Sequence, residues 1–279
     1  MNHFKFSFII PHFNSEESLF KLIDTIPDRN DIQIIIVDDI SDKDSFTSVS
    51  HFLENSTYCS SIKLLSNTHA KGAGVSRNVG LSASSGKYVI FCDADDYLIS
   101  ENFNELEKNL NEYTDIYFTR PTSIDVSTGK MSDRHIDLSD LVILNSKYIG
   151  TEYLVPWGKV FRGDFLREKR IIWFDATRVA NDVMFSVRAF NLAKEVELLN
   201  LCFYCVTKRE TGLTQNNKSA DLRTRLEVTL KKINYVIDND LPHRKNSMIG
   251  LLYKYNKVIT FRQFLIILRM SMLKKVRFF

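Results

Sequence analysis

Three aspartates close a short apolar run near the middle of the first half of the chain. Residues 87–92 are rich in β-branched and aromatic side chains and follow Gly86, which predicts a buried strand. Asp93, Asp95 and Asp96 come directly after it. Crowded carboxylates repel one another unless a cation neutralises them, and hard oxygen ligands suit Mg²⁺ or Mn²⁺. The pattern therefore predicts a divalent-metal site, with a solvated acidic turn as the alternative.

Two earlier strand-like runs also end in polar residues. Residues 6–10 lead to Pro11 and Asn14, and residues 32–37 lead to Asp38 and Asp39. Helical spacing of apolar residues separates the runs, which predicts βαβ units and a parallel sheet. Ligands of such sheets bind beyond the carboxyl ends of the strands. We therefore expect these loops and the three aspartates to meet at one edge.

The rest of the chain continues the alternation and then changes character. Further helices are expected at 16–26, 46–53, 74–83, 103–110 and from 183, and further strands at 62–65, 115–119, 171–174, 196–199 and 201–206. Residues 121–149 lack a clear period and are interpreted as an excursion over the site. From about residue 221 the pattern is helical. The sequence thus predicts an α/β fold with a mostly parallel sheet flanked by helices and a C-terminal helical extension.

Composition excludes several classes of protein. The 279 residues are 44% hydrophobic and 25% charged, as in ordinary globular proteins, and the net charge of +3 is too small to indicate a nucleic-acid partner. The Cys202–Cys205 pair lacks the second ligand pair of a zinc site, so reduced packing cysteines are expected. The N-terminus has no signal-peptide pattern, and we expect a cytoplasmic protein.

Four segments in this order resemble the GT-A fold glycosyltransferases of family 2, inverting enzymes that use nucleotide-diphosphate sugars. The segments are 8–14, 36–42, 74–81 and 86–96. Residues 157–162, with Asn181 and Asp182, resemble the acceptor half of the same family. The resemblance implies a GT-A (Rossmann-like) domain over 1–215, with a nucleotide-sugar half (1–120) and an acceptor half (121–215), followed by the extension 216–279.

The resemblance implies roles for residues of the first half. Those implied to bind the nucleotide sugar are Pro11, Phe13, Asn14, Asp39, Arg77, Asp93, Ala94 and Asp95. Asp39 would accept a hydrogen bond from a pyrimidine, which suits a UDP-sugar. Asp95 would ligate Mn²⁺ or Mg²⁺ on the donor diphosphate, and Asp93 would contact the ribose or the metal. Arg77 would approach the diphosphate or pair with an aspartate.

In the second half, Asp182 is implied to be the general base. It would take the proton of the acceptor hydroxyl as that oxygen attacks the anomeric carbon, with inversion; the alternative is a helix cap. The family usually has Glu-Asp where this chain has Asn181 and Asp182. Trp157, Lys159 and Asn181 would contact the acceptor, with a core position as the alternative for Trp157.

The implied activity is sugar transfer to a glycan or lipid-linked glycan in bacterial surface polysaccharide synthesis. A nucleotidyltransferase and a non-catalytic sugar-nucleotide or glycan-binding protein are the alternatives. Against the first, the opening loop lacks a Gly-rich basic stretch; against the second, both the metal carboxylate and the base are present. Lys208 and Arg209 begin a loop that would close over the diphosphate or form a solvated turn.

The C-terminal residues 261–279 mix basic and apolar side chains without any acidic residue. Such a helix can lie in the interface of an anionic membrane, so peripheral attachment to the inner face of the cell membrane is expected. Docking of the helix on the domain is the alternative. No window is long and apolar enough for a spanning helix.

Overall fold

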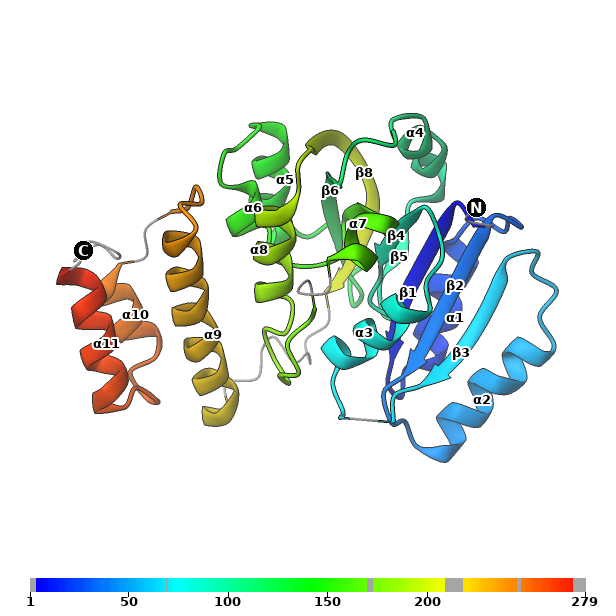
Figure 1. Cartoon of the computed structure of the whole chain (residues 1–279). Helices are drawn as coiled ribbons and strands as arrows, with labels where there is room; N and C mark the ends of the chain where they lie inside the picture. The colour runs from blue at the N-terminus through cyan, green and yellow to red at the C-terminus, as the bar shows by residue number, and fades with distance from the viewer. Residues whose placement is uncertain (1–3, 69, 170–172, 209–217, 245–246, 273–279) are drawn as a thin grey trace.

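One mixed sheet organises the molecule (Figure 1). The computed structural model describes residues 4–68, 70–169, 173–208, 218–244 and 247–272. Within them, eight strands pair in the order β3-β2-β1-β4-β7-β6-β8-β5. The strands are β1 Phe6–His12, β2 Ile32–Asp38, β3 Ser61–Ser66, β4 Tyr88–Phe91, β5 Tyr97–Leu98, β6 Ile116–Asp125, β7 Lys159–Arg162 and β8 Val196–Lys208. The predicted α/β class is confirmed.

Strand β1 lies at the centre of the parallel part of the sheet. It pairs in parallel with β2 and β4, and β2 pairs in parallel with β3. His12 is opposite Asp38, and Ile9 is opposite Phe91. The carboxyl ends of these strands therefore point to one edge, as predicted, and the loops that follow them meet there.

The other half of the sheet is partly antiparallel and differs from the predicted elements. β7 runs antiparallel to β4 and β6, while β8 runs parallel to β6. β8 is one strand over residues 196–208, where two were predicted, because its pairing with β6 shifts register between Thr119 and Pro121 without ending the strand. β6 continues to Asp125, six residues past the predicted end at Thr119.

Helices cover the sheet and connect its strands. They are α1 Glu16–Thr25, α2 Lys43–Glu54, α3 Ala73–Ala83, α4 Phe103–Lys108, α5 Ile136–Ile143, α6 Ile149–Glu152, α7 Gly163–Glu168, α8 Val183–Leu192, α9 Ser219–Asp238, α10 Met248–Lys254 and α11 Phe261–Met272. Two 3₁₀ turns span Ser100–Asn102 (η1) and Asp133–His135 (η2). Contrary to the predicted excursion, residues 121–149 include part of β6, η2 and α5, which packs against β6 and β8.

The structure also bears on the expected strand at 171–174 and on the cysteines. Residues 171 and 172 of the expected strand 171–174 lie outside the described residues, and Trp173 and Phe174 belong to no strand. Of the pair that was expected to pack, Cys205 is buried and Cys202 is half-buried, while Cys92 is buried and Cys59 is exposed.

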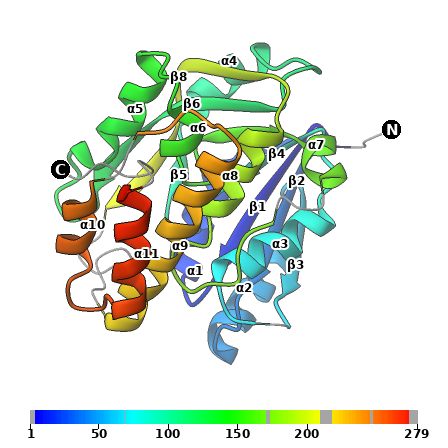
Figure 2. The same ribbon diagram turned by 60° about the vertical axis from the view of Figure 1, so that its left-hand side comes forward.

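A cluster of aromatic rings fastens α8 to the sheet. The Phe185 ring stacks on Phe174 at 3.8 Å and meets the edges of Phe91 on β4 and Phe161 on β7. These side chains are fully or almost fully buried, and each aromatic pair adds about 1 kcal/mol beyond area burial. α8 is thereby held between the sheet and α9 (Figures 1 and 2).

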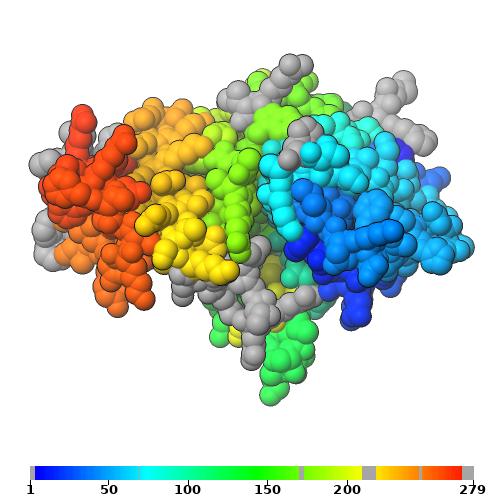
Figure 3. Space-filling model, turned by 90° about the horizontal axis from the view of Figure 1, so that it is seen from below, coloured from blue at the N-terminus to red at the C-terminus, as the bar shows by residue number. Residues whose placement is uncertain are grey.

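The last three helices have a hydrophobic cluster of their own. It contains Leu226, Leu230, Ile233, Met248, Leu251, Tyr255, Val258, Ile267 and Met270. In the space-filling view, α10 and α11 lie at one end of the molecule and the parallel strands and their helices at the other (Figure 3). None of the helices within the described residues has the length and hydropathy of a membrane span.

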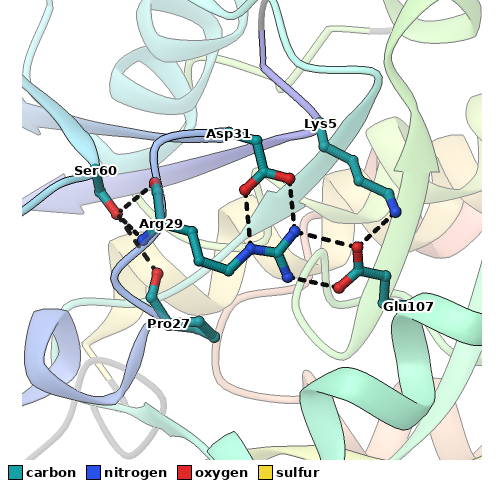
Figure 4. A network of polar contacts seen from close by, with 6 residues as sticks. All are labelled: Lys5, Pro27, Arg29, Asp31, Ser60 and Glu107. Atoms are coloured by element: carbon teal, nitrogen blue, oxygen red, sulfur yellow. Dashed lines mark hydrogen bonds and ion pairs between the residues drawn. The ribbon is translucent and has the colours of Figure 1, made fainter.

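A charged network joins the amino-terminal edge of the parallel strands, just before β1 and β2, to α4 (Figure 4). Arg29 pairs with Asp31 and with Glu107, and Lys5 also binds Glu107. Arg29, with Lys5, lowers the pKa of Glu107 to about 2, so the carboxylate stays ionised in the folded state. This contribution to stability is present above the ordinary Glu pKa and is lost as pH falls toward 2.

Candidate active site

The loops after β1 and β2 are fastened to each other by Asn14. Asn14 has a φ of +44°, a conformation that Asn tolerates better than most residues. Its N–H donates to Ser41 Oγ at 3.1 Å, and its Oδ1 accepts from the Asp42 N–H at 2.9 Å. Phe13 beside it is 44% exposed, with Lys71 Nζ 3.3 Å from the ring centroid. An aromatic ring and a cation thus stand at the surface of this edge.

Asp39 is a preorganised carboxylate at the same edge. It is 6% exposed, and its Oδ1 accepts hydrogen bonds from Asn67 Nδ2 (2.9 Å), the Gly72 N–H (2.8 Å) and Ser76 Oγ (2.9 Å). These donors come from the ends of β3 and α3. Three donors to one carboxylate oxygen fix the position of the side chain. Pro11 lies one strand away, in register with Val37.

His12 belongs to the frame of this edge. It is buried, with Ser15 Oγ at 3.1 Å from Nδ1 and Ser45 Oγ at 3.3 Å from Nε2. Burial lowers the pKa of His12 against the opposing charges of Asp38 and Glu16. The ring therefore packs as a neutral group that joins the first loop to α2.

The three aspartates after β4 have different surroundings. Asp96 is buried and accepts from Tyr204 Oη and from the Thr207 N–H, each at 2.8 Å. Burial, with Asp93 and Asp95 nearby, raises the pKa of Asp96 well above the usual range. Asp93 and Asp95 are half-buried, so their carboxylates lie nearer the surface of the turn. Asp96 holds the turn in place, while the other two remain partly exposed.

Arg77 on α3 joins the two halves of the predicted site. Its Nη2 lies 2.5 Å from Asp93 Oδ1, and its Nη1 donates to Asn181 Oδ1 at 3.0 Å. The guanidinium also stands 5.3 Å over the Phe174 ring. Because Asn181 precedes Asp182, one buried cation connects the aspartate turn to the start of α8. The structure therefore contains the ion pair with an aspartate that was the alternative for Arg77.

Asp182 stands at the start of α8 without capping it. Its side chain makes no capping hydrogen bond, although its carbonyl accepts from the Ser186 N–H at 2.9 Å. Burial raises the pKa of the carboxyl group, against the opposing charges of Arg77 and Lys159. The carboxylate thus has a backbone hydrogen bond from its own residue and lies in the field of two cations, Arg77 and Lys159.

Lys159 is buried close enough to Asp182 for their charges to interact. Its Nζ donates to the Tyr153 carbonyl at 2.5 Å and lies 3.4 Å from Ser186 Oγ, one turn after Asp182 in α8. Burial lowers the pKa of Lys159 to about 7, and the charge of Asp182 opposes this change. The predicted contact of Lys159 with an acceptor remains a prediction.

Trp157 lies in an aromatic stack rather than at the surface. It is 6% exposed, stacks on Tyr204 with ring centroids 5.7 Å apart, and meets His135 and Tyr153 edge-on. Trp157 thus occupies the core position that was the alternative for it, and its contact with an acceptor remains a prediction. Lys208 pairs with Asp125, and Arg209 to Asn217 lie outside the described residues.

The chemistry of the turn fits a hard divalent cation that completes its coordination with ligand oxygens. Within the described residues, no group of three or more His, Cys, Asp or Glu side chains is arranged for a metal ion. Asp93 and Asp95 supply carboxylate oxygens at the strand end. Mg²⁺ and Mn²⁺ are commonly held by one or two carboxylates together with substrate phosphates and water. Asp95, with Asp93, would hold such an ion.

The family is decided by a sequence model. Residues 7–169, more than half of the chain, match the model for glycosyl transferase family 2. The chain belongs to this family. The matched residues include Asp39, Arg77 and the aspartate turn, while Asp182 lies beyond them.

Two curated relatives are polymer-modifying enzymes. Poly(ribitol-phosphate) beta-N-acetylglucosaminyltransferase TarS of Staphylococcus aureus is 26% identical over 212 residues, or 74% of this chain and 36% of its own length. Poly(ribitol-phosphate) beta-glucosyltransferase of Bacillus spizizenii is 26% identical over 221 residues, covering 74% of this chain and 33% of its own. The chain thus spans about a third of the length of these relatives.

Solved structures share the fold. TarS residues 1–349 in complex with UDP-GlcNAc superpose with a TM-score of 0.68 and 23% identity, over 91% of this chain and 71% of that one. A mannosyltransferase from Pyrobaculum calidifontis, solved with GDP-Man and Mn²⁺, superposes with a TM-score of 0.61 and 12% identity, over 96% of this chain and 75% of that one. The fold is therefore GT-A.

Sequence reasoning missed the buried partners of the aspartate turn. Tyr204 and Thr207 bind the turn from β8, more than 100 residues away in sequence. Both were placed in or next to a predicted strand without a role. Alternation along that strand could have shown which side chains face inward, but not that a tyrosine hydroxyl meets an aspartate.

Gly158 is required by the packing around Trp157. It has a φ of +66°, and a Cβ there would stand 2.3 Å from Tyr153 Oη. Gly158→Ala should lower the free energy of unfolding by about 3 kcal/mol, since backbone strain costs roughly 1–2 kcal/mol and overpacking a similar amount. Urea denaturation measures this loss.

Gly129→Ala is the matched control for Gly158→Ala. Gly129 also has a φ of +66° but nothing lies within 4 Å of its added Cβ. It should lose only the strain, about 1–2 kcal/mol. Equal losses for the two variants would show that Gly158 is not needed for the contact with Tyr153.

Proposed function

We propose that this chain is an inverting glycosyltransferase that moves a sugar from a UDP-sugar to a hydroxyl group of a glycan, polyol phosphate polymer or lipid-linked glycan. The carrying observation is the Arg77 bridge, which connects Asp93 of the aspartate turn to Asn181 beside Asp182. Donor-binding and proton-accepting carboxylates thereby belong to one site. The UDP-GlcNAc complex of TarS and the poly(ribitol-phosphate) activity named for two relatives support the substrate classes.

The donor is proposed to lie along the carboxyl edge of β1, β2 and β4. Asp39, fixed by three hydrogen bonds to Oδ1, accepts from the uracil imide. Pro11, Phe13 and Asn14 line the base on the side of the first loop, where the exposed Phe13 ring offers a flat apolar surface. Asp93, Ala94 and Asp95 face the ribose and diphosphate.

The metal ion is proposed to be Mn²⁺ or Mg²⁺, held by Asp95 with Asp93. When bound, such an ion stabilises the charge that develops on the leaving diphosphate. Arg77 draws the Asp93 carboxylate to one side through the 2.5 Å pair and thereby fixes the direction of the turn. Asp95 follows on the same turn, and we propose it as the principal ligand.

Asp182 is proposed to be the general base. It accepts the proton of the acceptor hydroxyl while that oxygen forms the new bond to the anomeric carbon and the bond to the diphosphate breaks, which inverts the configuration. Burial raises the pKa of Asp182, which makes its carboxylate a stronger base than an exposed aspartate. Asn181 supplies no second charge, and Arg77 occupies its Oδ1.

Asp182→Asn should leave UDP affinity within about twofold and slow transfer by roughly 10²–10⁴-fold, because an amide cannot accept the proton. UDP release from a panel of UDP-sugars, with poly(ribitol phosphate) or a lipid-linked saccharide as acceptor, measures the rate. Calorimetry measures UDP affinity. Asp95→Asn is the comparison variant and should lose metal-dependent UDP binding as well as transfer. Equal loss of binding and rate in Asp182→Asn would contradict its role as base.

We also propose that the chain attaches to the surface of an anionic membrane through α11. The last 39 residues hold nine Lys and Arg and no Asp or Glu, whereas the preceding 240 hold 28 basic and 34 acidic residues. On α11, Phe261 is 76% and Leu265 46% exposed, and Arg262 and Arg269 are exposed on the same turns. An apolar face beside basic side chains suits an anionic interface.

Phe261→Ser combined with Leu265→Ser should weaken binding to phosphatidylglycerol vesicles by about tenfold, because less apolar surface enters the interface. Co-sedimentation measures the bound fraction. These exposed positions are preferable to deletion of α11, whose Ile267 and Met270 are buried in the C-terminal cluster.

The control for the vesicle experiment is Ile143→Ser combined with Leu144→Ser. Both side chains are large and exposed, but they lie on and next to α5, where Asp137 and Asp140 are exposed. This variant should bind vesicles like the unaltered chain. Equal binding of the α11 variant and the unaltered chain would overturn the membrane proposal.

A further inference from the structure

Four hydrogen bonds that involve side chains hold the aspartate turn to β8, and three of them use the side chains of Tyr204 and Thr207. Tyr204 Oη accepts from the Asp93 N–H at 3.0 Å and donates to Asp96 Oδ2 at 2.8 Å. Thr207 Oγ1 donates to the Asp95 carbonyl at 2.6 Å. These contacts reach both ends of the turn that carries Asp93 and Asp95, so the position of the turn depends on β8.

β8 is a rigid support for these contacts. Tyr204 lies in strand pairs on both sides, opposite Leu98 of β5 and Pro121 of β6. Its side chain is fully buried.

The aromatic stack fixes the orientation of the Tyr204 ring. Trp157 lies parallel to the ring, with an interplanar angle of 2° and the centroids 5.7 Å apart, and His135 and Tyr153 meet Trp157 edge-on. A ring fixed in this way places its hydroxyl oxygen without further loss of side-chain entropy when a ligand binds. The buried Trp157 thus contacts the ring whose hydroxyl binds the turn.

We propose that Tyr204 and Thr207 are positioning residues for the metal-binding turn, and that they set the affinity of the site for Mn²⁺ in the presence of UDP. The proposal rests on the proposed function of Asp93 and Asp95. Partners that orient metal ligands, without touching the metal, typically change its affinity by about 10–100-fold when removed. Loss of Tyr204 Oη leaves the Asp93 N–H and the Asp96 carboxyl group without this partner, which loosens the turn.

The test is a titration of UDP-saturated protein with Mn²⁺, followed by electron paramagnetic resonance of the free ion, which needs no acceptor and no turnover. Tyr204→Phe should weaken Mn²⁺ binding by about 10–100-fold while UDP affinity without metal stays within twofold. Thr207→Val removes the bond to the Asp95 carbonyl with little change of shape and should weaken Mn²⁺ binding in the same direction. If Tyr204→Phe does not fold, the Mn²⁺ affinity of Thr207→Val decides the test.

Tyr153→Phe is the matched control. Tyr153 is also fully buried against Trp157, and its hydroxyl meets the carbonyls of Thr119 and Gly158 at 3.2 Å, away from the turn. This variant should bind Mn²⁺ like the unaltered protein even if its melting temperature falls. Mn²⁺ affinity within twofold in both β8 variants, or an equal loss in Tyr153→Phe, would overturn the proposal. A UDP affinity that Mn²⁺ leaves unchanged in the unaltered protein would instead contradict the proposed function itself.

Discussion

The guanidinium of Arg77 is the interaction on which the arrangement of the site depends. It neutralises Asp93, binds Asn181 and lies near enough to Asp182 to oppose the rise of its pKa. Without a buried cation, the carboxylates at the end of β4 and the start of α8 would repel one another. Their removal from water would add a large desolvation cost. The planar fork of arginine can hold two partners in fixed directions, which the single charge of lysine cannot.

The bridge requires α3 to approach the segment before α8 closely. Gly74 makes this possible, because a Cβ there would stand 2.6 Å from the Asp175 carbonyl and 2.8 Å from Asn181 Cβ. The Phe174, Phe185 and Phe91 rings then fix that segment and α8 against the sheet. The carboxyl edge of β1, β2 and β4, where the donor is proposed to bind, is thus built from local βαβ units. The segment before α8, on the other side of the site, is held to this edge by α3 and by the aromatic cluster.

The sequence predicted the parallel half of the sheet because each strand there is followed by its own helix and polar loop. Asp39, Asp93 and Asp95 could be placed together since parallel strands share a carboxyl edge. It did not predict the continuity of β8, whose register shift has no local signal, or the regular structure between 121 and 149. The burial of Trp157 and the contact between Tyr204 and Asp96 depend on pairing between distant strands, which no local pattern specifies.

The most direct test of the account is the position of Mn²⁺ in crystals grown with UDP, located by its anomalous scattering. The account predicts one peak between the Asp95 carboxylate and the diphosphate, with the uracil beside Asp39 and the Arg77 bridge between Asp93 and Asn181 retained. A peak bound to other residues, or UDP bound away from the carboxyl edge of β1, β2 and β4, would contradict it.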